Sequence, residues 1–388
     1  MTPEVDPFSA WFDPIIDRRE TESLKWEKYR GRDVIPLWVA DMDFRSPPAV
    51  VDALKARVDH GIFGYTLPPA ELIETILEML ARDYGWEVEP SWLVWLPGLV
   101  TGLNVACRAV GEDGAGVLTT VPIYPPFLSA PGLARRGLST APMVQNGGRW
   151  EFDLDRLERA VNRRTRLLLL CSPHNPTGRV FERYELAALA EFCERHDLVL
   201  CSDEIHSGLV LAPGRVHIPT ATLGPETARR TITLLAPSKT FNLPGLGCAF
   251  AIVPDTDLRR RFRRAMAGIV PHVNTLGYTA ALAAYRDAGS WHGELLTYLR
   301  ANRDLVRAAV AEMPGLATTE VEATYLAWID AKGTGLEDPG GFFEAAGVGL
   351  SDGEEFGAPG FLRLNFGCPR SLLSEALERM RRGLAGHR

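Results

Sequence analysis

Short apolar runs alternate with amphipathic stretches between residues 47 and 279. The apolar runs have the length of buried strands, and the stretches between them carry apolar residues at helical spacing, as Leu186, Leu189 and Cys193 do within residues 183–196. Strands that alternate with helices are typical of a mostly parallel sheet. The pattern therefore predicts an α/β domain with strands at residues 116–121, 166–171, 198–203, 232–236 and 248–253.

The pattern changes after residue 289. It predicts a long helix over residues 291–313, a strand over 325–329, a helix near Gly341, a strand over 361–366 and a final helix. This order indicates a smaller α+β domain that packs against the first and leaves a cleft for a ligand. We therefore predict an N-terminal segment of residues 1–46 that joins the small domain, a large domain of residues 47–289 and a small C-terminal domain of residues 290–388.

Polar residues stand at the ends of three predicted strands. Asn175 follows the run RLLLLC, Asp203 ends the run VLCSD and Lys239 follows the run ITLLAP. The carboxyl ends of parallel strands lie at one edge of a sheet, where ligands bind. An amine, a carboxylate and an amide are the groups that a pyridoxal ring needs for its aldehyde, ring nitrogen and phenolic oxygen. Each residue alone has an ordinary explanation as a surface charge, a helix cap or a turn, but the ordered set favours this site.

Longer motifs carry a resemblance to a known family that covers nearly the whole chain. They are WVADMDF at residues 38–44, FGYT at 63–66, NPTG at 175–178, SDEIH at 202–206, SKTFN at 238–242 and FLRLNFGCPRS at 361–371. With them the chain resembles the fold-type I pyridoxal-phosphate enzymes of the class I/II aminotransferase superfamily. Within that superfamily it is most similar to the cystathionine β-lyase, or C–S lyase, branch of the MalY/PatB type.

The resemblance implies roles for individual residues. The implied catalytic residues are Lys239, Tyr124 and Asp203. The implied contacts to pyridoxal 5'-phosphate come from these three and from Asn175, His206, Ser238, Leu99, Val100, Thr101 and Tyr65. The implied substrate contacts come from Arg363, which binds the carboxylate, from the backbone N–H near Ala40, and from Tyr65 and Asn175. The resemblance also implies a homodimer in which Tyr65 reaches the site of the second subunit.

Three positions depart from the usual aminotransferase pattern. Gly247 stands eight residues after Lys239, where those enzymes usually have a phosphate-binding arginine, and Ala236 stands where a serine is common. These two departures put the binding of the phosphate in question. His206 replaces a tyrosine, and we expect either a neutral histidine packed beside the cofactor or a catalytic role.

The resemblance implies a lyase that cleaves cystathionine or related cysteine S-conjugates to a thiol, pyruvate and ammonia. Two alternatives remain open from the residues alone. A class I/II aminotransferase would use the same cofactor chemistry, and a cofactor-binding regulatory protein would have lyase activity only incidentally. The preferred thioether is not defined by the sequence.

Composition narrows the setting of this activity. The formal net charge of -7 over 388 residues favours no nucleic-acid partner, and no apolar run has the length of a membrane span. The N-terminus carries acids and prolines where a secretory signal would be apolar. The six cysteines and eight histidines show no metal-ligand spacing, so we expect no metal and reduced core cysteines. We therefore expect a cytoplasmic enzyme.

Overall fold

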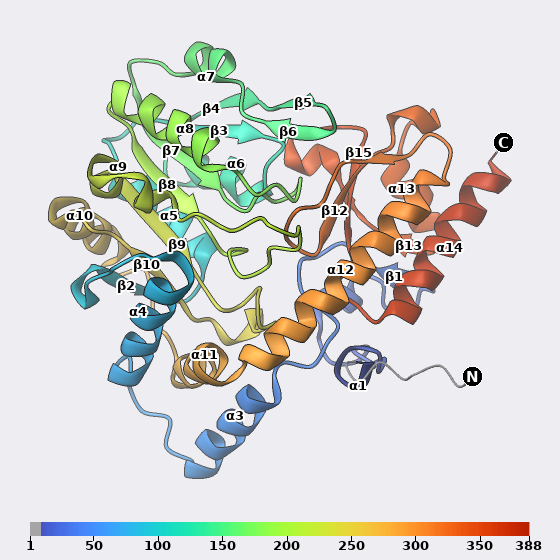
Figure 1. Ribbon diagram of the computed structural model, residues 1–388, viewed down its shortest axis with the longest axis horizontal. Coiled ribbons are helices and arrows are strands. Elements are labelled where there is room, and N and C mark those ends of the chain that lie inside the picture. The colour runs from blue at the N-terminus through green and yellow to red at the C-terminus, as the bar shows by residue number, and fades with distance from the viewer. Residues whose placement is uncertain (1–8, 388) are drawn as a thin grey trace.

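The computed structural model describes residues 9–387, so the first eight residues of the predicted N-terminal segment lie outside the described part. Its centre is a seven-stranded sheet in the order β2-β10-β9-β8-β7-β3-β4 (Figure 1). All neighbouring pairs are parallel except those of β10, which is antiparallel to both of its neighbours. The strands are β2 (Leu93–Leu96), β3 (Gly116–Val121), β4 (Gly137–Pro142), β7 (Thr165–Cys171), β8 (Val199–Asp203), β9 (Thr231–Leu235) and β10 (Ala249–Ile252).

Helices cover both faces of this sheet, which explains why its central strands β7, β8 and β9 are almost wholly buried. One face packs against α5 (Leu99–Ala109), α6 (Pro125–Leu133) and α10 (Thr256–Met266). The other face packs against α4 (Ala70–Tyr84), α7 (Leu154–Ala160), α8 (Arg183–Arg195) and α11 (Thr275–Asp287). In α8, Leu186, Leu189 and Cys193 form the buried stripe that the spacing predicted, and Glu182 and Glu185 form a capping box at its start. The predicted α/β class is confirmed.

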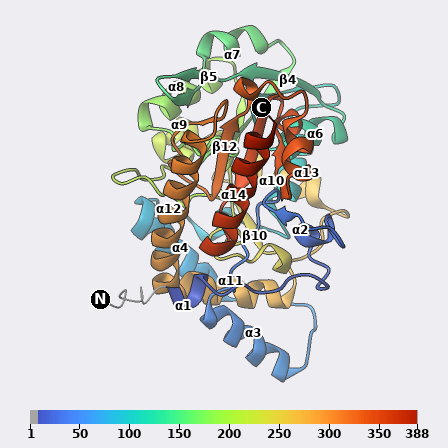
Figure 2. The same cartoon turned by 90° about the vertical axis from the view of Figure 1, so that its right-hand side faces the viewer.

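The C-terminal part forms a second, smaller layer, coloured orange to red in Figure 1. Its antiparallel sheet has the order β11-β12-β15-β14, with β11 (Ala317–Thr318), β12 (Leu326–Asp330), β15 (Phe361–Asn365) and β14 (Ser351–Asp352). The helices are α12 (Gly289–Ala311), α13 (Pro339–Ala345) and α14 (Arg370–Gly386), and α12 and α14 lie side by side in Figure 2. The predicted order of long helix, strand, helix, strand and final helix is confirmed, with bounds that shift by one or two residues.

The N-terminal segment runs along both layers. It contains the short helices α1 (Ser9–Phe12) and α2 (Leu24–Glu27), and β1 (Ile35–Pro36), which pairs in parallel with β13 (Val348–Gly349). The helix α3 (Pro48–His60) then leads through an irregular connection to α4. The remaining hairpin joins β5 (Val144–Asn146) to β6 (Arg149–Glu151), and α9 (Pro225–Arg229) precedes β9. The domain bounds given above remain a prediction.

The state of the cysteines and the hydropathy of the helices bear on the cellular location expected from the sequence. All six cysteines are buried and unpaired, as predicted. Among residues 9–387, none of the helices is long and apolar enough to cross a membrane.

The helix α10 carries a local cluster of arginines, although the net charge of the whole chain is negative. Arg259 donates to the carbonyls of Val253 and Pro254, and Arg263 donates to those of Ser91 and Leu93. These two arginines therefore bind backbone oxygens just after β10 and at the start of β2.

Candidate active site

A cavity of about 210 Å³ lies at the carboxyl ends of β7, β8 and β9, facing the first turn of α5. This is the edge of an α/β sheet at which ligands bind. The cavity brings together nine of the predicted residues, which are Ala40, Leu99, Val100, Tyr124, Asn175, Asp203, His206, Ser238 and Lys239. Gly247 and Ala236, the two departures, also line it, together with Pro97, Gly98, Cys171, Ile205, Pro244 and Cys248. The predicted residues Thr101, Arg363 and Tyr65 are not part of the lining.

Asp203 and Lys239 form the electrostatic centre of this cavity. Asp203 is the last residue of β8 and is paired in register with Cys171 on β7 and Leu234 on β9. Burial raises the pKa of the Asp203 carboxyl to about 7, although the N–H of Ile205 and the Lys239 amine favour its ionised form. Burial lowers the pKa of the Lys239 amine to about 8. The carboxylate therefore lacks a full partner, and a cation placed beside it would favour its charged form.

The Lys239 amine is anchored to a backbone oxygen. Lys239 follows β9 in the turn that holds Ser238 and Asn242, and its Nζ donates a hydrogen bond to the carbonyl of Ala40. A lowered pKa keeps a lysine partly unprotonated near neutral pH, which a nucleophile or a base requires.

A hydrogen bond from Arg363 fixes the orientation of the Asn175 amide. Its Oδ1 accepts a hydrogen bond of 3.0 Å from Nη1 of Arg363. A guanidinium has donors only, so this bond assigns the amide oxygen to Arg363 and leaves the NH₂ group of Asn175 free to donate. The amide can therefore donate to an anionic oxygen in the cavity.

Arg363 lies behind Asn175 on β15 and is buried. Its Nη2 donates to the carbonyl of Trp38 at 2.7 Å and to Oγ of Ser351 at 3.2 Å, and its Nε has no partner among the described residues. Burial lowers the pKa of the guanidinium to about 10, and the ring of Phe356 lies 4.7 Å from it. The spare N–H groups can bind a further acceptor, and the charge of Arg363 favours the neutral form of the Lys239 amine in the cavity.

Tyr124 and His206 complete the polar lining. Tyr124 stands directly before α6, and burial raises the pKa of its hydroxyl. Burial lowers the pKa of His206 to about 3, so its imidazole is neutral at ordinary pH. The Nδ1 atom of His206 is buried and has no hydrogen-bond partner among the described residues. Buried polar atoms are almost always paired, so this atom points to a polar ligand in the cavity.

The first turn of α5 offers backbone donors at one end of the cavity. The first N–H groups of a helix have no acceptor within it, and they attract anions. Gly247 closes the same end with φ of 60°, and a Cβ at this position would lie 3.2 Å from the carbonyl oxygen of Pro97. The backbone therefore favours glycine here, and an arginine at this position would be strained and would need a small shift of the turn.

Tyr65 lies outside the cavity of its own chain. It is fully exposed in the irregular connection between α3 and α4, together with the exposed residues Ile62, Phe63 and Leu67. This connection runs along the outer edge of the molecule, at the lower left of Figure 1.

Sequence reasoning missed three residues that hold the site together. Asn242 and Asn365 bind the backbone of residues 38–44, and the hydroxyl of Tyr325 donates to the carbonyl of Ala40 at 3.0 Å. Asn242 and Asn365 belong to the motifs SKTFN and FLRLNFG, but the motifs alone do not show what these amides bind.

The residues present fit pyridoxal 5'-phosphate. The cavity holds an amine for the aldehyde, a buried carboxylate for the ring nitrogen, a free amide N–H for the phenolic oxygen and helix N–H groups for the phosphate. Over residues 9–387, there is no group of three or more His, Cys, Asp or Glu side chains that could hold a metal ion.

Comparison with known proteins agrees with this geometry. Cystathionine beta-lyase PatB of Bacillus subtilis (strain 168) is 36% identical over 390 residues, which cover 96% of this chain and 100% of that protein. A crystal structure of OvoB is 50% identical with a TM-score of 0.94 and covers 96% of this chain and 98% of that one. The structure of cystalysin from Treponema denticola, which contains a pyridoxal 5'-phosphate cofactor, is 31% identical with a TM-score of 0.93, covering 97% and 99%.

The fold is therefore that of the fold-type I pyridoxal-phosphate enzymes. The model of the family described as aminotransferase class I and II matches residues 32–380. Because this match spans both layers of the structure, the chain belongs to the class I and II aminotransferase family.

Proposed function

We propose that the chain is a pyridoxal-phosphate-dependent C–S β-lyase, which cleaves cystathionine or a related cysteine S-conjugate to a thiol, pyruvate and ammonia. The observation that carries the proposal is the placement of the Lys239 amine and the buried Asp203 carboxylate in one cavity. The full-length similarity to a cystathionine beta-lyase supports cleavage over amino transfer.

When bound, pyridoxal 5'-phosphate supplies an aldehyde that captures the amino group of the substrate and a ring that withdraws electrons from its α-carbon. Asp203 keeps the ring nitrogen protonated, because a buried carboxylate without a full partner favours a cation beside it. Asn175 would donate its free N–H to the phenolic oxygen, and Tyr124, which lines the same cavity, would pack against the ring. The hydroxyl of Ser238 and the N–H groups of Leu99, Val100 and Thr101 would bind the phosphate.

Lys239 acts on the substrate as a base. Its free amine would take the proton from the α-carbon of the substrate, and the electron pair of that bond would expel the thiolate from the β-carbon. His206 stays neutral beside the ring and adds no charge to it. In an aminotransferase the same amine would instead return the proton to the cofactor, so the two reactions differ in where Lys239 delivers it.

A single assay series tests the proposed reaction. The purified protein is expected to absorb visible light once pyridoxal 5'-phosphate is added, and addition of cystathionine should release pyruvate and thiol. The same preparation is then tested for amino transfer to a panel of keto acids. Transfer without thiol release would overturn the lyase assignment and leave an aminotransferase.

We propose that Arg363 binds the substrate carboxylate, assisted by the backbone N–H near Ala40. Arg363→Lys is expected to raise KM about 100-fold, because an ammonium cannot form the two parallel bonds of a guanidinium. The variant also loses the contact to Asn175. Steady-state kinetics measure the effect, and Arg381→Lys on the exposed face of α14 is the matched control. An unchanged KM for Arg363→Lys would remove the residue from the substrate site.

We further propose a homodimer in which Tyr65 of one subunit completes the site of the other. Its support is the exposed apolar connection that carries Tyr65 away from its own cavity. Mixing Tyr65→Phe subunits with Lys239→Ala subunits is expected to restore about a quarter of the wild-type activity, since half of the dimers are mixed and each has one intact site.

A matched mixture controls for activity that does not come from a shared site. Subunits that carry both substitutions, mixed with Lys239→Ala subunits, contain no intact site and are expected to stay inactive. If the first mixture stays equally inactive, each site is complete within one chain.

The unpaired thiols of all six cysteines support the cytoplasm as the place of this reaction.

A further inference from the structure

Residues 38–44 form an irregular segment whose carbonyl groups are bound by side chains, and we name it the strap. Arg363 and Ser351 donate to Trp38, and Asn365 donates to Val39 and Asp41 at 2.7 Å each. Further donors are Lys25 to Asp41, and Asn242 to Met42 and Phe44. Buried backbone groups need such partners, and here they fix the strap against both layers of the structure.

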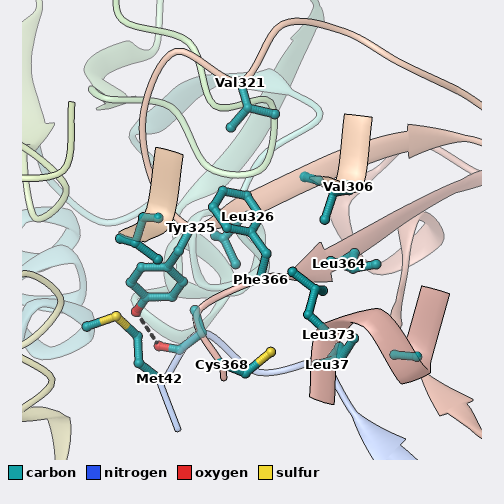
Figure 3. Close-up of a cluster of buried hydrophobic side chains, with 14 of the residues drawn as sticks. Leu37, Met42, Val306, Val321, Tyr325, Leu326, Leu364, Phe366, Cys368 and Leu373 are labelled. Atoms are coloured by element: carbon teal, nitrogen blue, oxygen red, sulfur yellow. Dashed lines mark hydrogen bonds between the residues drawn. The ribbon is translucent and has the colours of Figure 1, made fainter. Parts of the chain in front are cut away.

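The carbonyl oxygen of Ala40, in the middle of the strap, receives two donors. They are the Lys239 amine and the Tyr325 hydroxyl, the latter at 3.0 Å. Tyr325 is 1% exposed, and its ring packs in the apolar cluster that includes Met42 and Leu326 (Figure 3). The dashed line in Figure 3 marks the bond of its hydroxyl. A carbonyl oxygen has two lone pairs, so both are taken when the amine is free.

Charged and titratable groups face the amine from every side. Asp41 on the strap and Asp203 on β8 favour the ammonium form, whereas Arg363 on β15 and burial favour the neutral amine. His206 and Tyr124 line the same cavity and are neutral at ordinary pH. The Ala40 oxygen is the uncharged acceptor among these groups, and it is the one that the amine contacts.

We propose that Tyr325 is a positioning residue for Lys239: its hydroxyl occupies one lone pair of the Ala40 carbonyl and so limits how tightly that oxygen holds the lysine amine. The inference rests on the proposed role of Lys239 as the base. Two donors on one oxygen weaken each other, because each withdraws electron density from it. Tyr325 thereby keeps the amine anchored but ready to accept a proton.

Tyr325→Phe removes the competing donor and leaves the ring in place. The Ala40 oxygen then binds the amine alone, and the ammonium form, which has the stronger donor, gains more than the neutral form. The protonated lysine is inactive as a base, so proton removal needs a higher pH. A hydrogen-bond change of ordinary size shifts the midpoint upward by about half a pH unit.

The test measures proton removal separately from thiol release. The holoenzyme is incubated with L-alanine in deuterated water, and the exchange of the α-proton is followed by NMR across pH. L-alanine has no β-leaving group, so exchange occurs whether the enzyme is a lyase or an aminotransferase. The proposal expects the acidic midpoint of the exchange rate against pH to be higher in Tyr325→Phe than in the parent. If the holoenzyme exchanges the α-proton but releases no thiol from cystathionine, only the proposed function is overturned.

A second measurement uses no cofactor. The rate of reductive methylation of Lys239 in the cofactor-free protein, read by peptide mass spectrometry across pH, reports the titration of the amine directly. The proposal expects the same upward shift in Tyr325→Phe. Both midpoints are properties of folded molecules, so a lower yield of the variant leaves them readable.

Tyr29→Phe is the matched control. Tyr29 is also buried, and its hydroxyl donates to Glu344 at 3.1 Å, outside the residues that line the cavity. This variant loses a buried hydroxyl and is expected to keep the parent midpoint in both measurements. An unchanged or lower midpoint in Tyr325→Phe overturns the proposal.

Discussion

Replacement of Lys239 with alanine is expected to lower turnover by at least about four orders of magnitude, because it removes both the covalent attachment and the base. The amine lies in the same cavity as the buried Asp203 carboxylate, and its pKa of about 8 suits proton removal. The measurement is pyruvate release from cystathionine by the variant saturated with pyridoxal 5'-phosphate.

The exposed lysine Lys55, replaced by alanine, serves as the control and is expected to keep the parent rate. Lys239→Ala is expected to bind the cofactor without added methylamine, because the proposed contacts to the phosphate and the ring remain. Thiol elimination at the parent rate by Lys239→Ala would show that another group removes the proton.

The second large effect is expected for Asp203→Asn, in which activity and stability change in opposite directions. The amide cannot hold a protonated ring nitrogen by charge, so kcat/KM is expected to fall about 100- to 1,000-fold. Steady-state kinetics with a saturating cofactor concentration measure this loss. Asp52→Asn, an exposed carboxyl on α3, is the control for the change of charge.

The stability of the cofactor-free protein follows from the raised pKa of Asp203. Burial raises the folded-state pKa from 3.8 to about 7, so ionisation of this carboxyl favours the unfolded chain. The contribution to stability is fully present below the unfolded pKa and is lost as pH rises towards about 7. The cofactor-free Asp203→Asn protein is therefore expected to melt at a higher temperature than the parent above neutral pH. Equal melting temperatures there would mean that the carboxylate already has a full partner.

The sequence predicts the centre of the large sheet because its strands are buried on both faces. The apolar run RLLLLC predicts a strand that is buried on both faces, and the structure has this strand as β7. The edge strand β4, GLSTAP, is largely exposed, and β2, LVWL, has only four residues, although Pro90 and Pro97-Gly98 flank it. The exposed pattern of β4 does not distinguish it from a loop, and the apolar run of β2 is too short to separate a strand from a helical turn. The antiparallel direction of β10 also has no local signal, because direction depends on the connections.

The site was predictable to the extent that it depends on strand ends. Asn175, Asp203 and Lys239 meet because their strands end at one edge of the sheet. Tyr325 and Asn365 bind backbone carbonyls of an irregular segment far away in the sequence, and no periodicity reports such contacts. Arg363 was predicted as a substrate ligand, but its present bonds to Asn175 and Trp38 are visible only in three dimensions.

The turn at Gly247 limits how this enzyme can be redesigned. A positive charge at this end of the cavity is an obvious way to strengthen the grip on a phosphate group. The left-handed backbone and the nearby oxygen of Pro97 make any side chain at Gly247 strained, so a substitution there would cost stability. An engineer would have to rebuild the loop before α5 first, or introduce the cation from another element of the chain.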